Sequence, residues 1–320
     1  MLTREHLRLK IFQTLYQTQL SKKKDLMEIE KELYVSIQKT YDIYIYYFLL
    51  LDQLLRYSNY RIALGKQKKL PAADDLQPNL KFVNNRVLNK LTQLPALSLT
   101  AKQNKISLEN EELLIQSAYQ YLLQQPAYQS YMQSEEDSFE HDQKSLVQIA
   151  KALINFQPFL IFLTEKSVYA QLDDIDRMAS MVIKTVKKIP ADAPAFLYPA
   201  YKLEYKPFIS TLLRKTVINS AWIEEKLKQN SSNWDIERFA TIDIVLLKMA
   251  ITEALEFDSI PTKVTMDEYI EFSKHYSTEK SSTFINGLLE KVLYLLYQEG
   301  KLHKEVLDAK RKLALSQKND

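Results

Sequence analysis

The stretch that decides the fold reads Tyr276-Ser277-Thr278-Glu279-Lys280-Ser281-Ser282-Thr283-Phe284-Ile285-Asn286-Gly287-Leu288-Leu289-Glu290-Lys291. Thr278 is a plausible helix cap, because an acidic first turn beginning at Glu279 suits the positive end of a helix. We therefore predict a helix over Glu279–Gln298. Gly287 inside it costs about 1 kcal/mol relative to alanine. We expect this glycine to let another helix approach closely, and Asn286 to cap or bridge a neighbouring backbone.

Three more helices are predicted upstream of this stretch. They cover Phe208–Lys228, Trp234–Phe257 and Lys263–Tyr276, where apolar residues recur at helical spacing. Ser232 or Asn233 is a plausible cap for the second of them. A boundary before these helices is marked by closely spaced prolines: Pro190, Pro194, Pro199 and Pro207.

The preceding part of the chain is also predicted to be helical. The predicted helices cover Arg4–Leu20, Leu26–Tyr57, Leu80–Leu94, Glu111–Gln125, Leu146–Leu163 and Ser167–Lys188. The acidic segment Ser130–Asp142 is expected to be a loop. The most apolar stretch, Ile43–Leu51, is too short for a membrane span. Met1–Lys10 lacks the apolar core of a signal peptide, so we expect a cytoplasmic protein that does not associate with a membrane.

The composition favours an all-α fold and excludes several kinds of site. Gly65, Gly287 and Gly300 are the only glycines, and they are too far apart for a phosphate-cradling loop or a dinucleotide fingerprint. The absence of cysteine excludes disulfides, thiolate zinc sites and a cysteine nucleophile. The four histidines are scattered without metal-ligand spacing. We therefore expect no metal, no cofactor and no catalytic residue.

Charge is unevenly distributed, although the formal net charge is only +3. Residues 61–105 are mostly basic, with Arg61, Lys66, Lys68, Lys69, Lys81, Arg86, Lys90, Lys102 and Lys105. Residues 109–142 are mostly acidic, with Glu109, Glu111, Glu112, Glu135, Glu136, Asp137, Glu140 and Asp142. A basic block attracts phosphate backbones. Alternatively, the two blocks neutralise each other across the fold, and both interpretations remain open at this point.

Several motifs in the last third resemble the NusB family of transcription antitermination factors. Asn233–Glu253 is similar to the entry and apolar main helix of the NusB C-terminal bundle, which ends in glutamate. Ile260–Val264 resembles the family's Val-Pro-x-Lys-Val turn, and Asp267-Glu268 resembles its Asn-Glu. Tyr276–Lys291 resembles the Phe-Val-Asn-Gly helix and its approach. Order and spacing agree over Phe208–Val292, so the resemblance implies a NusB-like helical bundle.

A shorter resemblance lies near the start of the chain. Leu15–Ser21 is similar to the Leu-Tyr-x-x-Gln-Leu of the first NusB helix. If both ends align, a large helical insertion follows the first helix. The resemblance then implies four regions: a first NusB-like helix at 1–25, an insertion of unknown role at 26–199, the C-terminal bundle at 200–299, and a basic tail at 300–320.

The resemblance also implies a function and partners. NusB proteins pair with NusE, a small-subunit ribosomal protein, on the single-stranded boxA element of ribosomal RNA transcripts. The pair acts in the antitermination complex of RNA polymerase. The residues implied for NusE binding are Tyr16, Leu20, Glu237 and Asp243. Alternatively, Asp243 is a first-turn carboxylate favoured by the helix dipole.

The RNA-binding residues implied by the resemblance combine cations with one aromatic side chain. They are Arg4, Arg8, Lys10, Lys248, Lys280, Ser281, Ser282 and Phe284. Cations hold phosphates, and Phe284 either stacks on an unpaired base or belongs to the core of its helix. The N-terminal cations either bind RNA or form a solvated helix face.

One departure from the family concerns its dense N-terminal arginine cluster. In this chain the matching stretch has fewer cations, because Glu5 and Leu9 stand among them. Because each lost phosphate contact weakens binding, either this protein binds RNA less well alone or the basic block at 61–105 supplies the missing charge. A protein-only scaffold that has lost direct RNA binding is the main alternative. NusB-like domains also precede a cytosine methyltransferase domain, but this chain lacks the glycine-rich loop and cysteine that such an enzyme needs.

Overall fold

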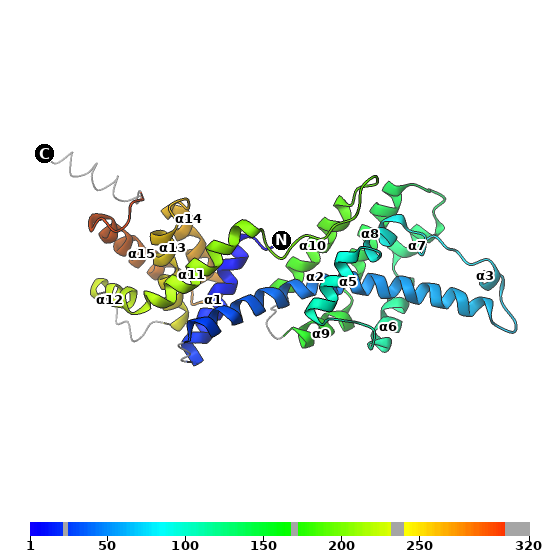
Figure 1. The fold of residues 1–320 in the computed structure, drawn as a ribbon, viewed down its shortest axis with the longest axis horizontal. Coiled ribbons are helices and arrows are strands. Elements are labelled where there is room, and N and C mark those ends of the chain that lie inside the picture. Colours follow the sequence, from blue (N-terminus) through cyan, green and yellow to red (C-terminus); the bar gives the residue numbers. More distant parts are fainter. Residues whose placement is uncertain (22–24, 168–171, 232–239, 305–320) are drawn as a thin grey trace. The chain divides into compact units, whose positions relative to one another are not determined.

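The computed structural model describes residues 1–21, 25–167, 172–231 and 240–304. Within these ranges the regular structure consists of α-helices α1–α15 and one short 3-10 helix, with an isolated bridge between Leu2 and Tyr201 and no strand (Figure 1). The all-α prediction is confirmed. The chain forms two compact units, which we call the bundle unit (Leu2–Val35 and the chain from Tyr201 onward) and the central unit (Met1 and Ser36–Ala200).

The bundle unit is organised around one helix that is buried on nearly all sides. Its helices are α1 (Arg4–Ser21), the first part of α2 (Leu26–Lys66), η1 (Leu203–Tyr205), α11 (Lys206–Ile218), α12 (Ser220–Asn230), α13 (Thr241–Glu256), α14 (Thr262–Tyr276) and α15 (Ser281–Gln298). Helix α13 packs against α1, α11, α12, α14 and α15. Leu246, Leu247, Met249 and Ala250 are each fully buried in it, which explains its continuous apolar sequence.

The boundaries of the bundle unit differ in part from the sequence expectation. The unit takes in the start of α2 as far as Val35, so the segment outside it runs from Ser36 to Ala200 rather than over 26–199. The single helix expected over Phe208–Lys228 is interrupted at Asn219, between α11 and α12. The expected start of the next helix, at Trp234, lies outside the described residues.

The central unit contains the remainder of α2 and eight further helices among its described residues. They are α3 (Ala73–Leu76), α4 (Arg86–Thr92), α5 (Pro95–Asn104), α6 (Glu112–Leu123), α7 (Pro126–Gln133), α8 (Phe139–Ile154), α9 (Gln157–Lys166) and α10 (Leu172–Lys188). Helix α8 packs against α4, α6, α7 and α10. The loop expected over Ser130–Asp142 is wrong at both ends, because α7 continues to Gln133 and the Ser138 hydroxyl caps α8 by accepting the backbone N–H of His141.

The most apolar stretch of the sequence is buried inside the central unit. Within α2, the Tyr44 hydroxyl lies 2.7 Å from the Thr185 hydroxyl of α10, and the Tyr47 ring packs edge-on against Phe159 of α9.

Among the described residues no single helix is long and apolar enough to cross a membrane. Only α8 and α9 taken together reach that length and composition, and the pair is bent by 69°.

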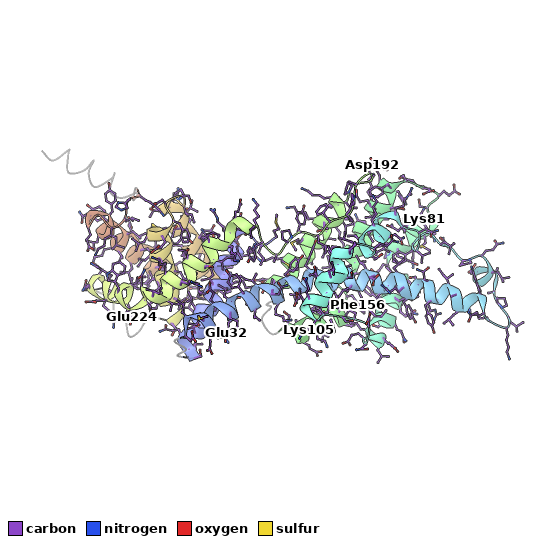
Figure 2. All side chains as sticks on the ribbon, viewed as in Figure 1. Glu32, Lys81, Lys105, Phe156, Asp192 and Glu224 are labelled. Carbon is purple, nitrogen blue, oxygen red and sulfur yellow. The ribbon has the colours of Figure 1, made fainter. Side chains whose placement is uncertain are left out.

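The basic and acidic blocks neutralise each other in part within the central unit. Arg86 forms ion pairs with Asp137 and Asp142, and the Lys81 ammonium donates to the backbone carbonyls of Ser134 and Glu136 (Figure 2 labels Lys81). Burial raises the pKa of Asp142, but hydrogen bonds from Arg86 and Tyr131 outweigh it, so this pKa is lowered. These cations stabilise the fold and are not free for phosphate.

Candidate nucleic-acid and partner interface

The core of the bundle unit contains a buried ion pair between α1 and α13. Arg8 donates through Nε and Nη2 to the two carboxylate oxygens of Glu253, at 2.7 and 2.9 Å. Thr265 and Tyr269 of α14 donate to the same carboxylate, at 2.9 and 3.2 Å. Burial disfavours the charged guanidinium, but Glu253 outweighs it and raises the pKa of Arg8. The same burial, with the nearby Glu253 charge, raises the pKa of Tyr269 well above its usual value.

Three of the cations predicted to bind RNA are therefore not on the surface. Arg8 is only 3 % exposed and is committed to Glu253. Lys10 is 1 % exposed. Lys248 is buried in α13, and its ammonium lies 2.9 Å from the carboxylate of Glu224 on α12, which Figure 2 labels. The hydrogen bond and charge of Lys248 lower the pKa of Glu224. The prediction that these three side chains contact phosphate is wrong for this structure, because each lies in the core.

Arg4 remains accessible at the start of α1. Its side chain is exposed, and its guanidinium carbon lies 5.3 Å from the ring centroid of Tyr205 and 5.9 Å from that of Phe208. A guanidinium resting on aromatic rings keeps its charge and its outward N–H donors. Arg4 can therefore contact an anion without leaving the aromatic surface.

A buried carboxylate ties the start of α13 to the turn between α14 and α15. Asp243 accepts hydrogen bonds from the hydroxyls of Ser277 and Ser281, at 2.6 and 2.8 Å. The Ser281 hydroxyl also lies 2.8 Å from that of Thr278. Because Asp243 and Ser281 are both buried and bonded to each other, neither is exposed to a partner or to RNA as predicted. Their role in this structure is to hold the turn at residues 277–281.

This turn presents Lys280 to solvent. Lys280 is exposed and is the N-cap residue of α15, whose first turn contains no acidic residue. Ser282 is half-buried and donates to the carbonyl of Glu279. Phe284 is 7 % exposed, which favours its alternative assignment as a core residue over base stacking.

The second half of α1 carries the residues expected to bind NusE. Leu20 is 60 % exposed near the end of α1. Tyr16 is half-buried and stacks on Phe12, which in turn packs against Tyr276 of α14 with 5.9 Å between ring centroids. The middle of α1 therefore packs against the residue that directly precedes the turn presenting Lys280. Glu237, also expected in this interface, lies outside the described residues.

The packing role predicted for Gly287 is wrong. A Cβ atom placed on it meets nothing within 4 Å, and both Gly287 and Asn286 are exposed on α15. Within the part of the chain that the structure describes, no helix approaches this position, so the glycine is not needed for close packing there.

Replacing Gly287 with alanine is therefore expected to stabilise the bundle unit by about 1 kcal/mol, because alanine restricts the unfolded chain and favours the helix. Urea unfolding followed by tryptophan fluorescence measures this change. A loss of stability in the alanine variant would show that another group approaches this face.

Comparison with known proteins agrees with the arrangement of the bundle. The NusB family model matches residues 174–294. The transcription antitermination protein NusB of Salinibacter ruber is 34% identical over 139 residues, which cover 43% of this chain and 81% of that protein. The chain belongs to the NusB family. Its relative from Natranaerobius thermophilus is 41% identical over 85 residues, 27% of this chain and 61% of that NusB. The NusB of Chloroherpeton thalassium is 37% identical over 102 residues, which cover 32% of this chain and 48% of that protein. No solved structure matches.

The NusB match extends beyond the bundle unit at one end and omits α1. It begins at residue 174, inside α10 of the central unit. This helix falls within the insertion predicted at 26–199. Helix α1 lies outside the matched range, yet it packs against α11 and α13 in the bundle unit. The structure therefore brings the first helix and the matched helices α11–α15 into one unit.

Proposed function

We propose that this NusB-family chain acts in transcription antitermination as an RNA-binding adaptor that pairs with NusE on boxA-type single-stranded RNA, with no bond-making chemistry of its own. The observation that carries the proposal is the placement of two surfaces at one end of the bundle unit. Tyr16 of α1 stacks on Phe12, and Phe12 packs against Tyr276, which directly precedes the turn that presents Lys280. A protein bound to the first surface then adjoins RNA bound to the second.

On the RNA side, the proposal rests on Lys280, Arg4 and the amino end of α15. The positive end of a helix and an adjacent ammonium both favour a phosphate. Ser281, which follows Lys280, is bonded to Asp243, and Arg8, one turn after Arg4, is bonded to Glu253. The ten residues from Asp243 to Glu253 span about 15 Å of α13. We propose that a short single strand crosses the surface of the bundle unit from one exposed cation to the other.

On the protein side, Tyr16 is a residue type that often dominates interface energies, and the exposed Leu20 adds apolar area beside it. NusE is the partner proposed for this face. The complex with RNA polymerase is proposed as the setting in which the pair acts.

A protein-only scaffold is the second candidate function. Burial of Arg8, Lys10 and Lys248 favours it, because only Arg4 and Lys280 remain exposed among the five cations expected to bind phosphate. A scaffold keeps the apolar end of α1 and does not require the cations.

The salt dependence of RNA binding distinguishes the two functions. The affinity for boxA-type RNA is measured by fluorescence anisotropy from roughly 50 to 200 mM salt. Replacing Arg4 and Lys280 with alanine is expected to reduce the slope of the log binding constant against the log salt concentration by about 1.4. This is about 0.7 for each lost phosphate contact to a single strand. Lys228→Ala with Lys301→Ala is the control, because it removes the same charge from α12 and from the segment that follows α15. An unchanged slope in the Arg4/Lys280 variant, or no RNA binding by the parent protein, supports the scaffold instead.

A further inference from the structure

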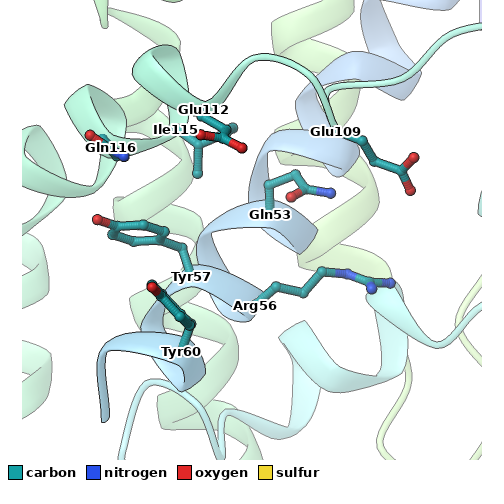
Figure 3. Close-up of a pocket in the computed structure, with 8 residues that line it drawn as sticks. All are labelled: Gln53, Arg56, Tyr57, Tyr60, Glu109, Glu112, Ile115 and Gln116. Atoms are coloured by element: carbon teal, nitrogen blue, oxygen red, sulfur yellow. The ribbon is translucent and has the colours of Figure 1, made fainter. Parts of the chain in front are cut away.

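The central unit contains a pocket that the proposed function does not use. It has a volume of about 340 Å³ and lies between α2 and the start of α6 (Figure 3). Tyr57 and Tyr60 project from α2 on one side, and Glu112 and Ile115 come from α6 on the other, with Glu109 in the segment before α6. This volume falls within the range of small-ligand sites, about 300–1,000 Å³.

The pocket has an excess of negative charge. Its one lining cation, Arg56, donates to Asp52 at 2.8 Å, so its charge is already compensated. Burial raises the pKa of Asp52, Arg56 opposes this, and Glu109 contributes a further rise. Neither Glu109 nor Glu112 forms an ion pair within the part of the chain that the structure describes, whereas their neighbour Glu111 is paired with Lys166 at 3.3 Å.

Aromatic rings form the other part of the wall. The Tyr57 and Tyr60 rings have centroids 6.1 Å apart and are inclined by 47°. Tyr57 is held by an edge contact with Tyr119, while Tyr60 is 56 % exposed. An aromatic face beside unpaired carboxylates is the combination that recognises organic cations.

We propose that this pocket binds an arginine side chain of a basic protein segment. A guanidinium is planar, so it stacks on Tyr60, and its positive charge is complementary to the carboxylates of Glu109 and Glu112. Free phosphate carries the wrong charge for the two carboxylates. A nucleotide could stack on the tyrosines, but its phosphate is repelled by the same two groups.

The test uses the full chain with ¹³C-labelled isoleucine δ1-methyl groups, because Ile115 lines the pocket and reports on its occupancy. The Ile115→Val variant assigns the signal by removing it. N-acetyl-arginine amide is expected to shift the Ile115 signal with a millimolar Kd. N-acetyl-citrulline amide, which has the same shape without the charge, is expected to cause no shift. An equal response to both, or no response to the arginine compound, overturns the proposal.

Two variants test which groups bind the cation. Glu109→Gln with Glu112→Gln preserves the shape of the wall. This double variant is expected to weaken binding about fivefold, because it removes the modest contributions of two exposed ion pairs. Tyr60→Leu is expected to weaken it about threefold through loss of the ring face. Glu135→Gln with Glu140→Gln removes the same charge from another exposed part of the unit and is expected to leave binding unchanged. Equal effects of the two double variants contradict the proposal, as does an Ile115 shift caused by uridine monophosphate alone.

Discussion

Replacing Glu253 with glutamine is expected to lower the free energy of unfolding of the bundle unit by about 3–5 kcal/mol, the usual cost of removing one partner of a buried ion pair. Glu253 is fully buried and accepts hydrogen bonds from Arg8, Thr265 and Tyr269, so it joins α1 and α14 to α13. Glutamine keeps the volume but removes the buried counter-charge of Arg8, which then retains only its longer ion pair with the partly exposed Glu268, at 3.3 Å. Since the guanidinium stays charged at any accessible pH, it cannot escape this cost by losing a proton.

Urea unfolding followed by tryptophan fluorescence measures this effect on the full chain. The sequence has two tryptophans, Trp222 and Trp234. Trp222 lies in α12 of the bundle unit, and neither tryptophan falls within residues 36–200, so the emission change reports on the bundle unit. Glu271→Gln is the matched control, because it removes an exposed carboxylate paired with Lys274 on the surface of α14. It is expected to cause no measurable change. Similar unfolding midpoints for the two variants would show that the Arg8–Glu253 pair is dispensable.

Replacing Asp243 with alanine is expected to cost about 3 kcal/mol, since each hydrogen bond to a charged acceptor contributes about 1.5–3 kcal/mol. The carboxylate is buried and bonded to the hydroxyls of Ser277 and Ser281. Removing it takes away the carboxylate that both hydroxyls bind, leaves them only each other and Thr278 as partners, and detaches the turn that presents Lys280 from α13. RNA affinity is therefore expected to fall together with stability.

Asp243→Asn separates this structural role from a direct contact with a partner. Asparagine retains an oxygen that accepts one of the two hydrogen bonds, so a smaller loss of about 1 kcal/mol is expected. The same fluorescence assay measures both variants. If alanine at this position abolished NusE binding without changing the unfolding curve, Asp243 would be a surface contact, as the family resemblance first implied.

The helical character of the bundle unit could be predicted from the sequence because it depends on local patterns. The apolar run of α13 and the helical spacing of α14 and α15 each follow from side-chain periodicity. The break at Asn219 was missed, since no glycine or proline marks it. The extent of α7 was missed because its polar sequence resembles a loop, although it buries Tyr128 and Tyr131.

The buried cations could not be recognised from the family resemblance alone. Arg8 and Glu253 are 245 positions apart, and no local pattern reveals such a partner. A signal was nevertheless present, because Lys248 and Glu253 interrupt the long apolar sequence of α13. A charged residue on a helix that is apolar on all sides indicates a buried pair rather than a surface contact.

The basic block of residues 61–105 illustrates the same limit. Its excess charge suggested RNA binding, yet Arg86 and Lys81 are bound to the acidic segment of the same unit. Lys68 is paired with Asp75 as well. Whether a charged residue contacts a partner or another part of its own chain depends on tertiary structure, which the order of charges along the sequence does not specify.

The most direct test of the proposed function is the affinity for boxA-type RNA measured with and without saturating NusE. Two ligands on adjoining surfaces of one bundle are expected to reinforce each other, so NusE should tighten RNA binding by about tenfold, a coupling of about 1.4 kcal/mol. By thermodynamic reciprocity, RNA should tighten NusE binding by the same factor. An RNA affinity that does not change when NusE is bound, or the absence of RNA binding in both conditions, would contradict the account.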